Sequence, residues 1–322
     1  MSVVVTGASG VVGGAVVRHL VASGRVPAAI SRSERSDGVI AGLGALPVRG
    51  DIMRPETLDV AFARADVVYH VAGLNTMCPH DPAELERVNV GGSVAVVEAA
   101  ERAGVRRIVY TSSAATIGEP SGTVGSEATA HRGSYLSHYE RSKHLAEMAV
   151  FEAARHVEVV AVNPSSVQGP GRATGTGALI LDVLRGRLPA LIDTRVSIVD
   201  IDDCAAGHLL AEERGEPGRR YLLNSFTVTM REAVGLLEQV TGRPLDPRWL
   251  PGWVASVAVL PVELVSRLRR RRPPFCREMV RTLRHGHAYD GGRAERDLGV
   301  RYTGPEELLR RLVSWFEAEG LL

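Results

Sequence analysis

The sequence is poor in cysteine and has almost no net charge. Its three cysteines, Cys78, Cys204 and Cys276, lie far apart among 322 residues. Such spacing fits neither a disulfide framework nor a zinc site, so we expect reduced thiols, mostly in the core of a cytoplasmic protein. The formal net charge of +1 gives no reason to expect nucleic acid or another acidic partner.

The sequence also lacks a hydrophobic run long enough to span a membrane. The longest later apolar stretch, 253–265, contains Pro261 and Glu263 and is shorter than the roughly 20 residues that a bilayer needs. The N-terminus runs directly into Val3, without the basic region and cleavage site of a signal peptide. Five arginines follow the apolar stretch, namely Arg267, Arg269, Arg270, Arg271 and Arg272. They indicate either a solvated helix end or a patch for weak association with a membrane surface.

The first half alternates short Val- and Ile-rich runs with helical patterns, which is typical of a parallel sheet covered on both faces. The runs predict strands at 2–6, 26–31, 46–49, 67–70, 107–111 and 158–162. Helical patterns between them cover 13–23, 55–64, 83–103 and 137–155. This order predicts an α/β fold with a doubly wound parallel sheet.

The pattern changes after Pro164. A glycine-rich loop at 169–177 precedes a short helix, and a strand–helix–strand pattern then spans 196–224. From Thr229 onward the pattern is helical and broken by prolines. We therefore predict a sheet domain at 1–165, to which 196–224 returns, and a smaller, mostly helical substrate-binding lobe formed by 166–195 and 225–322.

A glycine-rich loop joins the first predicted strand to the first predicted helix and reads Thr6-Gly7-Ala8-Ser9-Gly10-Val11-Val12-Gly13. Gly7 permits a tight turn, Gly10 lets the backbone approach a pyrophosphate, and Gly13 allows close packing of helix on strand. The helix N-terminus offers free amides and the positive end of a dipole to the phosphates. The candidate dinucleotide-binding residues are Gly7, Ser9, Gly10, Val11, Val12 and Gly13. A turn without a ligand is the alternative.

The end of the second strand indicates which dinucleotide binds. A carboxylate there would hold the ribose 2′-hydroxyl of NAD, but the sequence reads Ile30-Ser31-Arg32-Ser33, with no acid before Glu34. Arg32 suits the 2′-phosphate of NADP through charge-assisted hydrogen bonds. We therefore expect NADP as the cofactor, with NAD as the alternative. Arg32 could instead be a solvated surface arginine without a ligand.

A phenol and an ammonium, Tyr139 and Lys143, lie four residues apart on one face of a predicted helix. A nearby cation lowers the pKa of a phenol toward neutral pH, where the phenol can exchange a proton with an alkoxide. Thr111-Ser112-Ser113 ends the preceding strand, where sites in parallel sheets open. A hydroxyl there can hydrogen-bond a substrate oxygen.

The glycine loop, the strand-end serines and the Tyr139-x-x-x-Lys143 pattern resemble the extended short-chain dehydrogenase/reductase superfamily, with its NAD(P)-binding Rossmann domain. Within it, 163–171 and 198–208 resemble the branch of dihydroflavonol reductases and 3β-hydroxysteroid dehydrogenases, and a bacterial hopanoid-associated epimerase-like group is similar around 139–143 and 193–213. The resemblance implies Tyr139 as general acid/base, Lys143 as ribose ligand and Ser113 as the residue that orients the substrate oxygen. It also implies cofactor contacts from residues at strand ends and on one helix, namely Asp51, Ile52, Val71, Ala72, Gly73, Asn89, Thr111, Pro164 and Val167.

The resemblance implies an NADP(H)-dependent reductase of a ketone or aldehyde, or the reverse alcohol dehydrogenase, acting on a moderately apolar small molecule. A nucleotide-sugar epimerase with retained NAD stays open because it uses the same Ser, Tyr and Lys. Ala114 and Ala115 disfavour a sugar 4,6-dehydratase, and Gly118, where plant flavonoid reductases carry asparagine, disfavours a flavonoid substrate. A non-catalytic dinucleotide sensor is disfavoured because the Tyr/Lys pair is retained.

The ten histidines show no metal-ligand spacing, so we expect no metal site. The family commonly forms homodimers through two helices, here 83–103 and 137–155, and closed dimers are the commonest oligomers. These helices carry more apolar surface than one sheet face needs, from Val90, Val94, Val97, Ala100, Leu145, Met148 and Ala149, with Glu152 beside them on the second helix. We therefore expect a homodimer.

Overall fold

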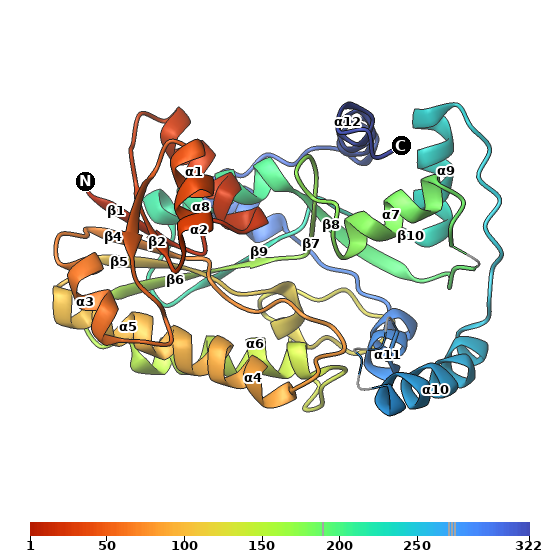
Figure 1. Cartoon of the computed structure of the whole chain (residues 1–322), viewed down its shortest axis with the longest axis horizontal. Helices are drawn as coiled ribbons and strands as arrows, with labels where there is room; N and C mark the ends of the chain where they lie inside the picture. Colours follow the sequence, from red (N-terminus) through yellow and green to blue (C-terminus); the bar gives the residue numbers. More distant parts are fainter. Residues whose placement is uncertain (189, 270, 272, 274) are drawn as a thin grey trace.

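The chain forms a large and a small β-sheet in a computed structural model that describes residues 1–188, 190–269, 271, 273 and 275–322 (Figure 1). The large sheet has seven parallel strands in the order β3-β2-β1-β4-β5-β6-β9. They are β1 (Val3–Thr6), β2 (Ala28–Ser31), β3 (Leu46–Arg49), β4 (Val67–His70), β5 (Arg107–Thr111), β6 (Glu158–Pro164) and β9 (Arg220–Leu223). The chain winds outward from β1 in both directions, which confirms the α/β doubly wound prediction and places the switch point between β1 and β4.

Helices cover both faces of this sheet (Figure 1). On one face lie α1 (Val11–Ala22), α2 (Glu34–Gly42) and α8 (Ile201–Arg214). On the other lie α3 (Glu56–Phe62), α4 (Pro82–Glu86), α5 (Gly92–Ala103) and α6 (His138–Ala153). Strands β1 and β4 are buried along their whole length, because apolar side chains point into a core on each face. Such runs are typical of parallel sheets.

The smaller lobe contains a three-stranded sheet in the order β10-β8-β7. It is formed by β7 (Ser166–Gln168), β8 (Arg195–Asp200) and β10 (Phe226–Thr229), with β7 parallel and β10 antiparallel to β8. Its helices are α7 (Thr176–Leu184), α9 (Met230–Thr241), α10 (Gly252–Leu268), α11 (Arg277–His285) and α12 (Pro305–Ala318). Residues of α7, α9 and α12 pack against β8 and β10 in a core of their own.

Four details differ from the sequence predictions. The segment 196–224 is divided, since β9 joins the large sheet whereas β8 pairs with β7 and β10. Helix α2 escaped prediction because its apolar pattern is weak; among its residues only Ile40 is buried. The predicted helix 83–103 is interrupted by a π-helical turn, Arg87–Gly91. Helix α10 continues through Pro261, although an interior proline removes one helical hydrogen bond.

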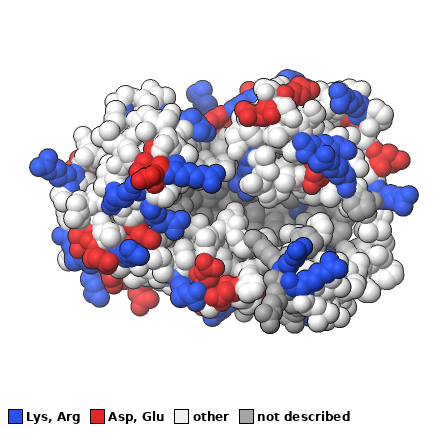
Figure 2. Space-filling view, in the orientation of Figure 1, with Lys and Arg blue, Asp and Glu red and all other residues white. Residues whose placement is uncertain are grey.

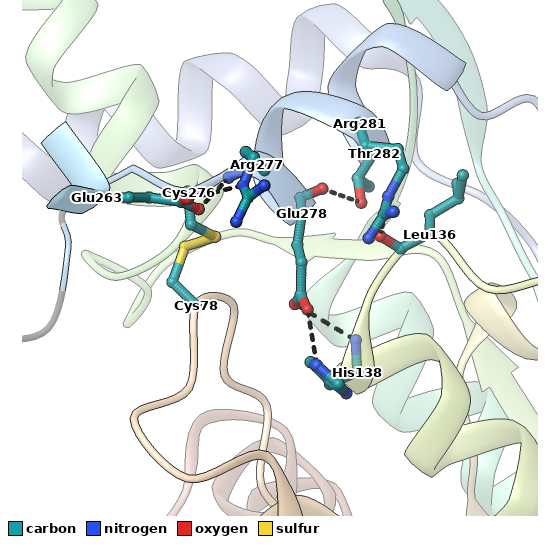
Figure 3. The surroundings of a disulfide bond; sticks show 9 residues. All are labelled: Cys78, Leu136, His138, Glu263, Cys276, Arg277, Glu278, Arg281 and Thr282. Atoms are coloured by element: carbon teal, nitrogen blue, oxygen red, sulfur yellow. Dashed lines mark hydrogen bonds and ion pairs between the residues drawn. A yellow bond between two sulfur atoms is a disulfide. The ribbon is translucent and has the colours of Figure 1, made fainter. Parts of the chain in front are cut away.

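The prediction of three reduced thiols is wrong. Cys78 and Cys276 form a disulfide across 198 residues, and Cys204 remains a free, buried thiol. The reason is tertiary, because the loop after β4 meets the start of α11, as Figure 3 shows. The prediction of a cytoplasmic location therefore loses the support that it drew from reduced cysteines. Within the described part of the chain, no helix is long and apolar enough to cross a membrane.

Part of the apolar surface expected for a dimer is absent. Val97 and Ala100 are fully buried, because α5 packs them into the core beneath the sheet. Met148 on α6 is 58% exposed and stays available at the surface. The predicted homodimer therefore depends mainly on α6.

Candidate active site

The glycine loop lies at the carboxyl end of β1, beside the switch point of the sheet. Gly7 has a positive φ of 76°, and a Cβ there would lie 2.6 Å from the backbone nitrogen of Ala72. A Cβ at Gly13 would clash with the carbonyl oxygen of Gly7. Glycine is therefore required at both positions, because the loop passes this close to its neighbours.

Helix α1 begins directly after this loop. Its N-cap is Gly10, and no described side chain caps the helix, so first-turn amides stay available. Free amides and the positive end of the helix dipole form a binding site for phosphate groups. The close approach of Gly7 and these amides fit the pyrophosphate of a dinucleotide.

A cavity of about 910 Å³ opens from the glycine loop, a volume in the range of ligand sites. Most of the predicted cofactor-binding residues line it, namely Gly7, Ser9, Gly10, Val11, Val12, Gly13, Arg32, Asp51, Ile52, Val71, Ala72 and Gly73. The cavity continues toward the smaller lobe, where Arg172, Pro273 and Met279 line it. The structure thus brings together residues from the ends of four strands, β1 to β4, and from both lobes.

Arg32 follows β2 and lines this cavity, as does Ser36 in the first turn of α2. Ser33 caps α2 by accepting a hydrogen bond from the amide of Ser36, at 3.3 Å. The guanidinium of Arg32 is exposed and forms no ion pair within the described residues. It is therefore free to meet an anionic group of a ligand.

Tyr139, Lys143 and Ser113 lie together at the carboxyl end of β5. Lys143 is buried, and its ammonium donates to the carbonyl oxygen of Thr111 at 2.9 Å and contacts the Tyr110 hydroxyl at 3.4 Å. Ser113 follows β5, where its hydroxyl accepts from the amide of Ala115 at 3.2 Å. Tyr139 is in the first turn of α6, close enough to Ser113 for that side chain to lower the pKa of the phenol.

Burial controls the proton affinities of this group. It raises the pKa of Tyr139, against the opposing effects of the Ser113 side chain and the positive charge of Arg172. It lowers the pKa of Lys143 to about 8, although the nearby carboxylate of Glu147 favours the charged form. At neutral pH, the phenol therefore carries its proton and most of the ammonium is charged.

Four other predicted cofactor residues, Asn89, Thr111, Pro164 and Val167, lie outside the lining of the cavity. Asn89 is buried and exchanges hydrogen bonds with the backbone of Leu74, at 2.7 and 3.0 Å, and donates to Ser142. The Thr111 hydroxyl pairs with His208 at 2.8 Å. Pro164 and Val167 are buried at the end of β6 and in β7. These residues do not line the cavity, and Asn89 supports Leu74, which does.

A family model described as the NAD dependent epimerase/dehydratase family matches residues 3–223. The chain belongs to this family. It is an enzyme of the extended short-chain dehydrogenase/reductase superfamily, as the sequence motifs predicted.

Two curated proteins and one solved structure are similar to this family member over nearly its whole length. "Sterol demethylase protein B" of Methylococcus capsulatus is 32% identical and covers 100% of both chains. "2-Alkyl-3-oxoalkanoate reductase" of Stenotrophomonas maltophilia is 30% identical and covers 97% of this chain and 98% of its own. The crystal structure of gox2253 superposes with a TM-score of 0.87 at 31% sequence identity. The match covers 100% of this chain and 99% of the gox2253 chain.

Several residues at the site of this epimerase/dehydratase family member escaped prediction. Arg172 lines the cavity and acts electrostatically on Tyr139, although Tyr139 itself does not line the cavity. The Nε atom of Arg172 is buried without a hydrogen-bond partner among the described residues. Met77 and Met279 line the same region from the two lobes. The only sequence signal for Arg172 was its place in the glycine-rich loop 169–177.

The structure also gathers histidines that looked scattered in the sequence. His285 and His287 meet Glu119, with ligand-type atoms of all three within 4.8 Å of one another. Glu119 is buried and accepts a hydrogen bond from His287 at 2.6 Å. Burial alone would raise the pKa of Glu119, but the hydrogen bond and charge of His287 outweigh it, so the pKa lies below its ordinary value.

Proposed function

We propose that the protein is an NADP(H)-dependent oxidoreductase that reduces a ketone or aldehyde of a moderately apolar small molecule, or oxidises the corresponding alcohol. The observation that carries this proposal is that Tyr139, Ser113 and Lys143 come together at the carboxyl end of β5, on the edge of the sheet where the glycine-loop cavity opens. A proton donor paired with a fixed hydroxyl is what carbonyl reduction requires.

The nicotinamide, when bound, would supply or accept the hydride. The half-buried phenol of Tyr139 holds its proton at neutral pH and donates it to the oxygen of the carbonyl group. Ser113 orients that oxygen through its hydroxyl. Lys143 provides a positive charge that stabilises the resulting phenolate and contacts the ribose.

Arg32 supports NADP as the cofactor. It lies at the end of β2, lines the cavity and stands where a carboxylate would favour NAD. A guanidinium forms strong, forked hydrogen bonds with a phosphate. Ser36, one turn into α2, adds a hydroxyl at the same wall of the cavity.

The lining of the cavity toward the smaller lobe supports an apolar substrate. Leu74, Met77, Pro273 and Met279 contribute apolar side chains to it. The relative named 2-alkyl-3-oxoalkanoate reductase supports a ketone as the reacting group. We assign substrate binding to 166–195 and 225–322, and cofactor binding to 1–165 with 196–224, although β8 within 196–224 pairs with the strands of the smaller lobe.

Arg172 favours a second candidate, a nucleotide-sugar epimerase with retained NAD. It places a positive charge in the cavity beside Tyr139, where a diphosphate could bind. An epimerase would use the same Ser113, Tyr139 and Lys143. The reductase remains our first proposal because Pro273 and Met279 add apolar side chains to the lobe-side wall.

A panel of ketones, aldehydes and sterols, followed by nicotinamide absorbance with NADPH and with NADH, tests the reductase. We expect turnover of an apolar carbonyl compound with NADPH. Fluorescence of the freshly purified protein tests the epimerase, because a retained NAD would stay bound through gel filtration. Bound NAD without net turnover of any carbonyl compound would contradict the reductase.

A further inference from the structure

The outward face of α10 is apolar over its whole described length. Exposed large apolar side chains recur every three or four residues and form one stripe, namely Trp253 (66% exposed), Val257 (61%), Leu260 (48%), Leu264 (60%) and Leu268 (77%). The other exposed residues that the structure describes in this helix are also apolar. A helix on the surface of a globular protein normally presents polar residues to water.

Two polar side chains of α10, those of Ser256 and Glu263, turn toward the protein instead. Ser256 accepts a hydrogen bond from Arg284 of α11, at 3.1 Å. The side chain of Glu263 is only 16% exposed and pairs with Arg277 at 2.8 Å, as Figure 3 shows. The polarity of α10 is thus inverted, so its outward stripe is fit to meet an apolar medium.

Basic residues continue this face beyond the helix. Arg269 and Arg271 are exposed, and the sequence carries three more arginines at 267, 270 and 272. Between Glu263 and Glu278, both held in ion pairs, the sequence contains no acidic residue. Figure 2 shows basic side chains among uncharged ones in the corner of the molecule where Figure 1 places α10 and α11.

We propose that α10 docks the protein on the surface of a membrane that contains anionic lipids. The stripe would enter the boundary between headgroups and acyl chains, while the arginines contact lipid phosphates. Trp253 at one end suits this boundary because its ring is amphipathic. A second copy of the chain fits the face less well, because the segment 264–277 offers arginines but no acidic residue to pair with them.

The docking face adjoins the cavity of the proposed enzyme. Pro273 and Met279, on the segment that links α10 to α11 and in α11 itself, line the cavity. A membrane bound to α10 would therefore lie close to the lobe-side wall of the cavity. The docking inference itself stands on the surface of α10 and does not require the proposed activity.

Flotation with lipid vesicles tests the inference on the full chain. We expect wild-type protein to float with vesicles of phosphatidylcholine and phosphatidylglycerol, and much less with phosphatidylcholine alone. The double variant Leu260→Ser/Leu264→Ser should lose flotation. Arg269→Gln/Arg271→Gln should bind anionic vesicles roughly tenfold more weakly or worse, because each basic residue near the surface contributes to the attraction. Val60→Ser, which changes an exposed valine on α3, is the matched control and should float like wild type.

A fluorescence measurement locates the helix directly. The three tryptophans are Trp249, Trp253 and Trp315, so Trp249→Phe/Trp315→Phe leaves Trp253 as the sole reporter. Its emission should shift to the blue on anionic vesicles and be quenched by brominated acyl chains. Failure of wild-type protein to bind anionic vesicles at low salt would overturn the proposal. So would equal flotation of the serine variant, or light scattering showing that the stripe joins two copies of the chain while vesicles do not bind.

Discussion

Cys78 and Cys276 are joined by a disulfide, with their Cα atoms 5.7 Å apart, beside the candidate cofactor cavity. Cys78 belongs to the loop after β4 and lines the cavity, and Cys276 is the N-cap of α11. The bond therefore ties a cofactor-side loop to the smaller lobe. Two further contacts hold α11 against the start of α6, since Glu278 pairs with His138 at 3.2 Å and Arg281 donates to the carbonyl oxygen of Leu136 (Figure 3).

Thiol titration should distinguish this pairing from three reduced cysteines. Unfolded without reductant, the protein should show one thiol per chain, from Cys204, and three after reduction. Cys276→Ser should show two thiols without reductant, because Cys78 is released. Its free energy of unfolding should be lower than that of the wild type by about 2–4 kcal/mol. Three reactive thiols in air-exposed wild-type protein would contradict the disulfide.

Tyr139→Phe should abolish turnover and leave the affinity for the dinucleotide nearly unchanged, since only the transferable proton is removed. General acid–base catalysis contributes roughly 10²–10⁴-fold, so kcat should fall by about that factor. Steady-state kinetics and cofactor titration measure the two effects. Tyr302→Phe, which removes a hydroxyl that contacts the backbone of Leu222 and Gly291, is the matched control and should keep normal kcat. Activity of Tyr139→Phe within about threefold of wild type would refute the assigned role.

Lys143 should impose a basic limb on the pH profile of activity. Burial lowers its pKa to about 8, so its charge is present below that pH and is lost as the pH rises through it. We expect kcat/KM for carbonyl reduction to decrease above about pH 8. Lys143→Met should lower both turnover and cofactor affinity at pH 7, and its residual activity should lack this limb. An unchanged basic limb in the variant would show that another group titrates.

Arg32→Asp should weaken NADPH binding far more than NADH binding, because it removes a charged hydrogen-bond donor and adds repulsion to the 2′-phosphate. Titration of the purified protein with each cofactor measures the ratio. Arg35→Asp is the matched control, because Arg35 is also exposed near the start of α2 but does not line the cavity. A wild-type preference for NADH would contradict the proposed cofactor.

We propose that the protein forms a homodimer through α6, on which Met148 is 58% exposed. Met148→Asp should shift the molar mass measured by light scattering toward that of the monomer. At a two-fold interface, the new carboxylate would be buried and would face the same carboxylate of the second subunit. Val60→Asp places the same charge on the exposed surface of α3 and should stay dimeric. A fully active wild-type monomer at micromolar concentration would contradict this assembly.

The doubly wound sheet was largely predictable from local sequence. Strands β1 and β4 are continuous apolar runs because both faces of the sheet are buried, and the glycines before α1 are dictated by backbone geometry that no other residue meets. The spacing of Tyr139 and Lys143 within one helix was likewise visible. Each of these features depends on residues that are close together in the sequence, so it can be predicted without knowledge of the tertiary structure.

Tertiary structure alone decided the features that join distant segments. The approach of Cys78 to Cys276, of Glu119 to His285 and His287, and of Arg172 to Tyr139 depends on how the smaller lobe meets the sheet. The sequence could show that α10 is apolar, but not that Ser256 and Glu263 turn inward and the apolar stripe outward. That orientation is set by the neighbours with which Ser256 and Glu263 pair, because a buried polar group must find a partner wherever the fold provides one.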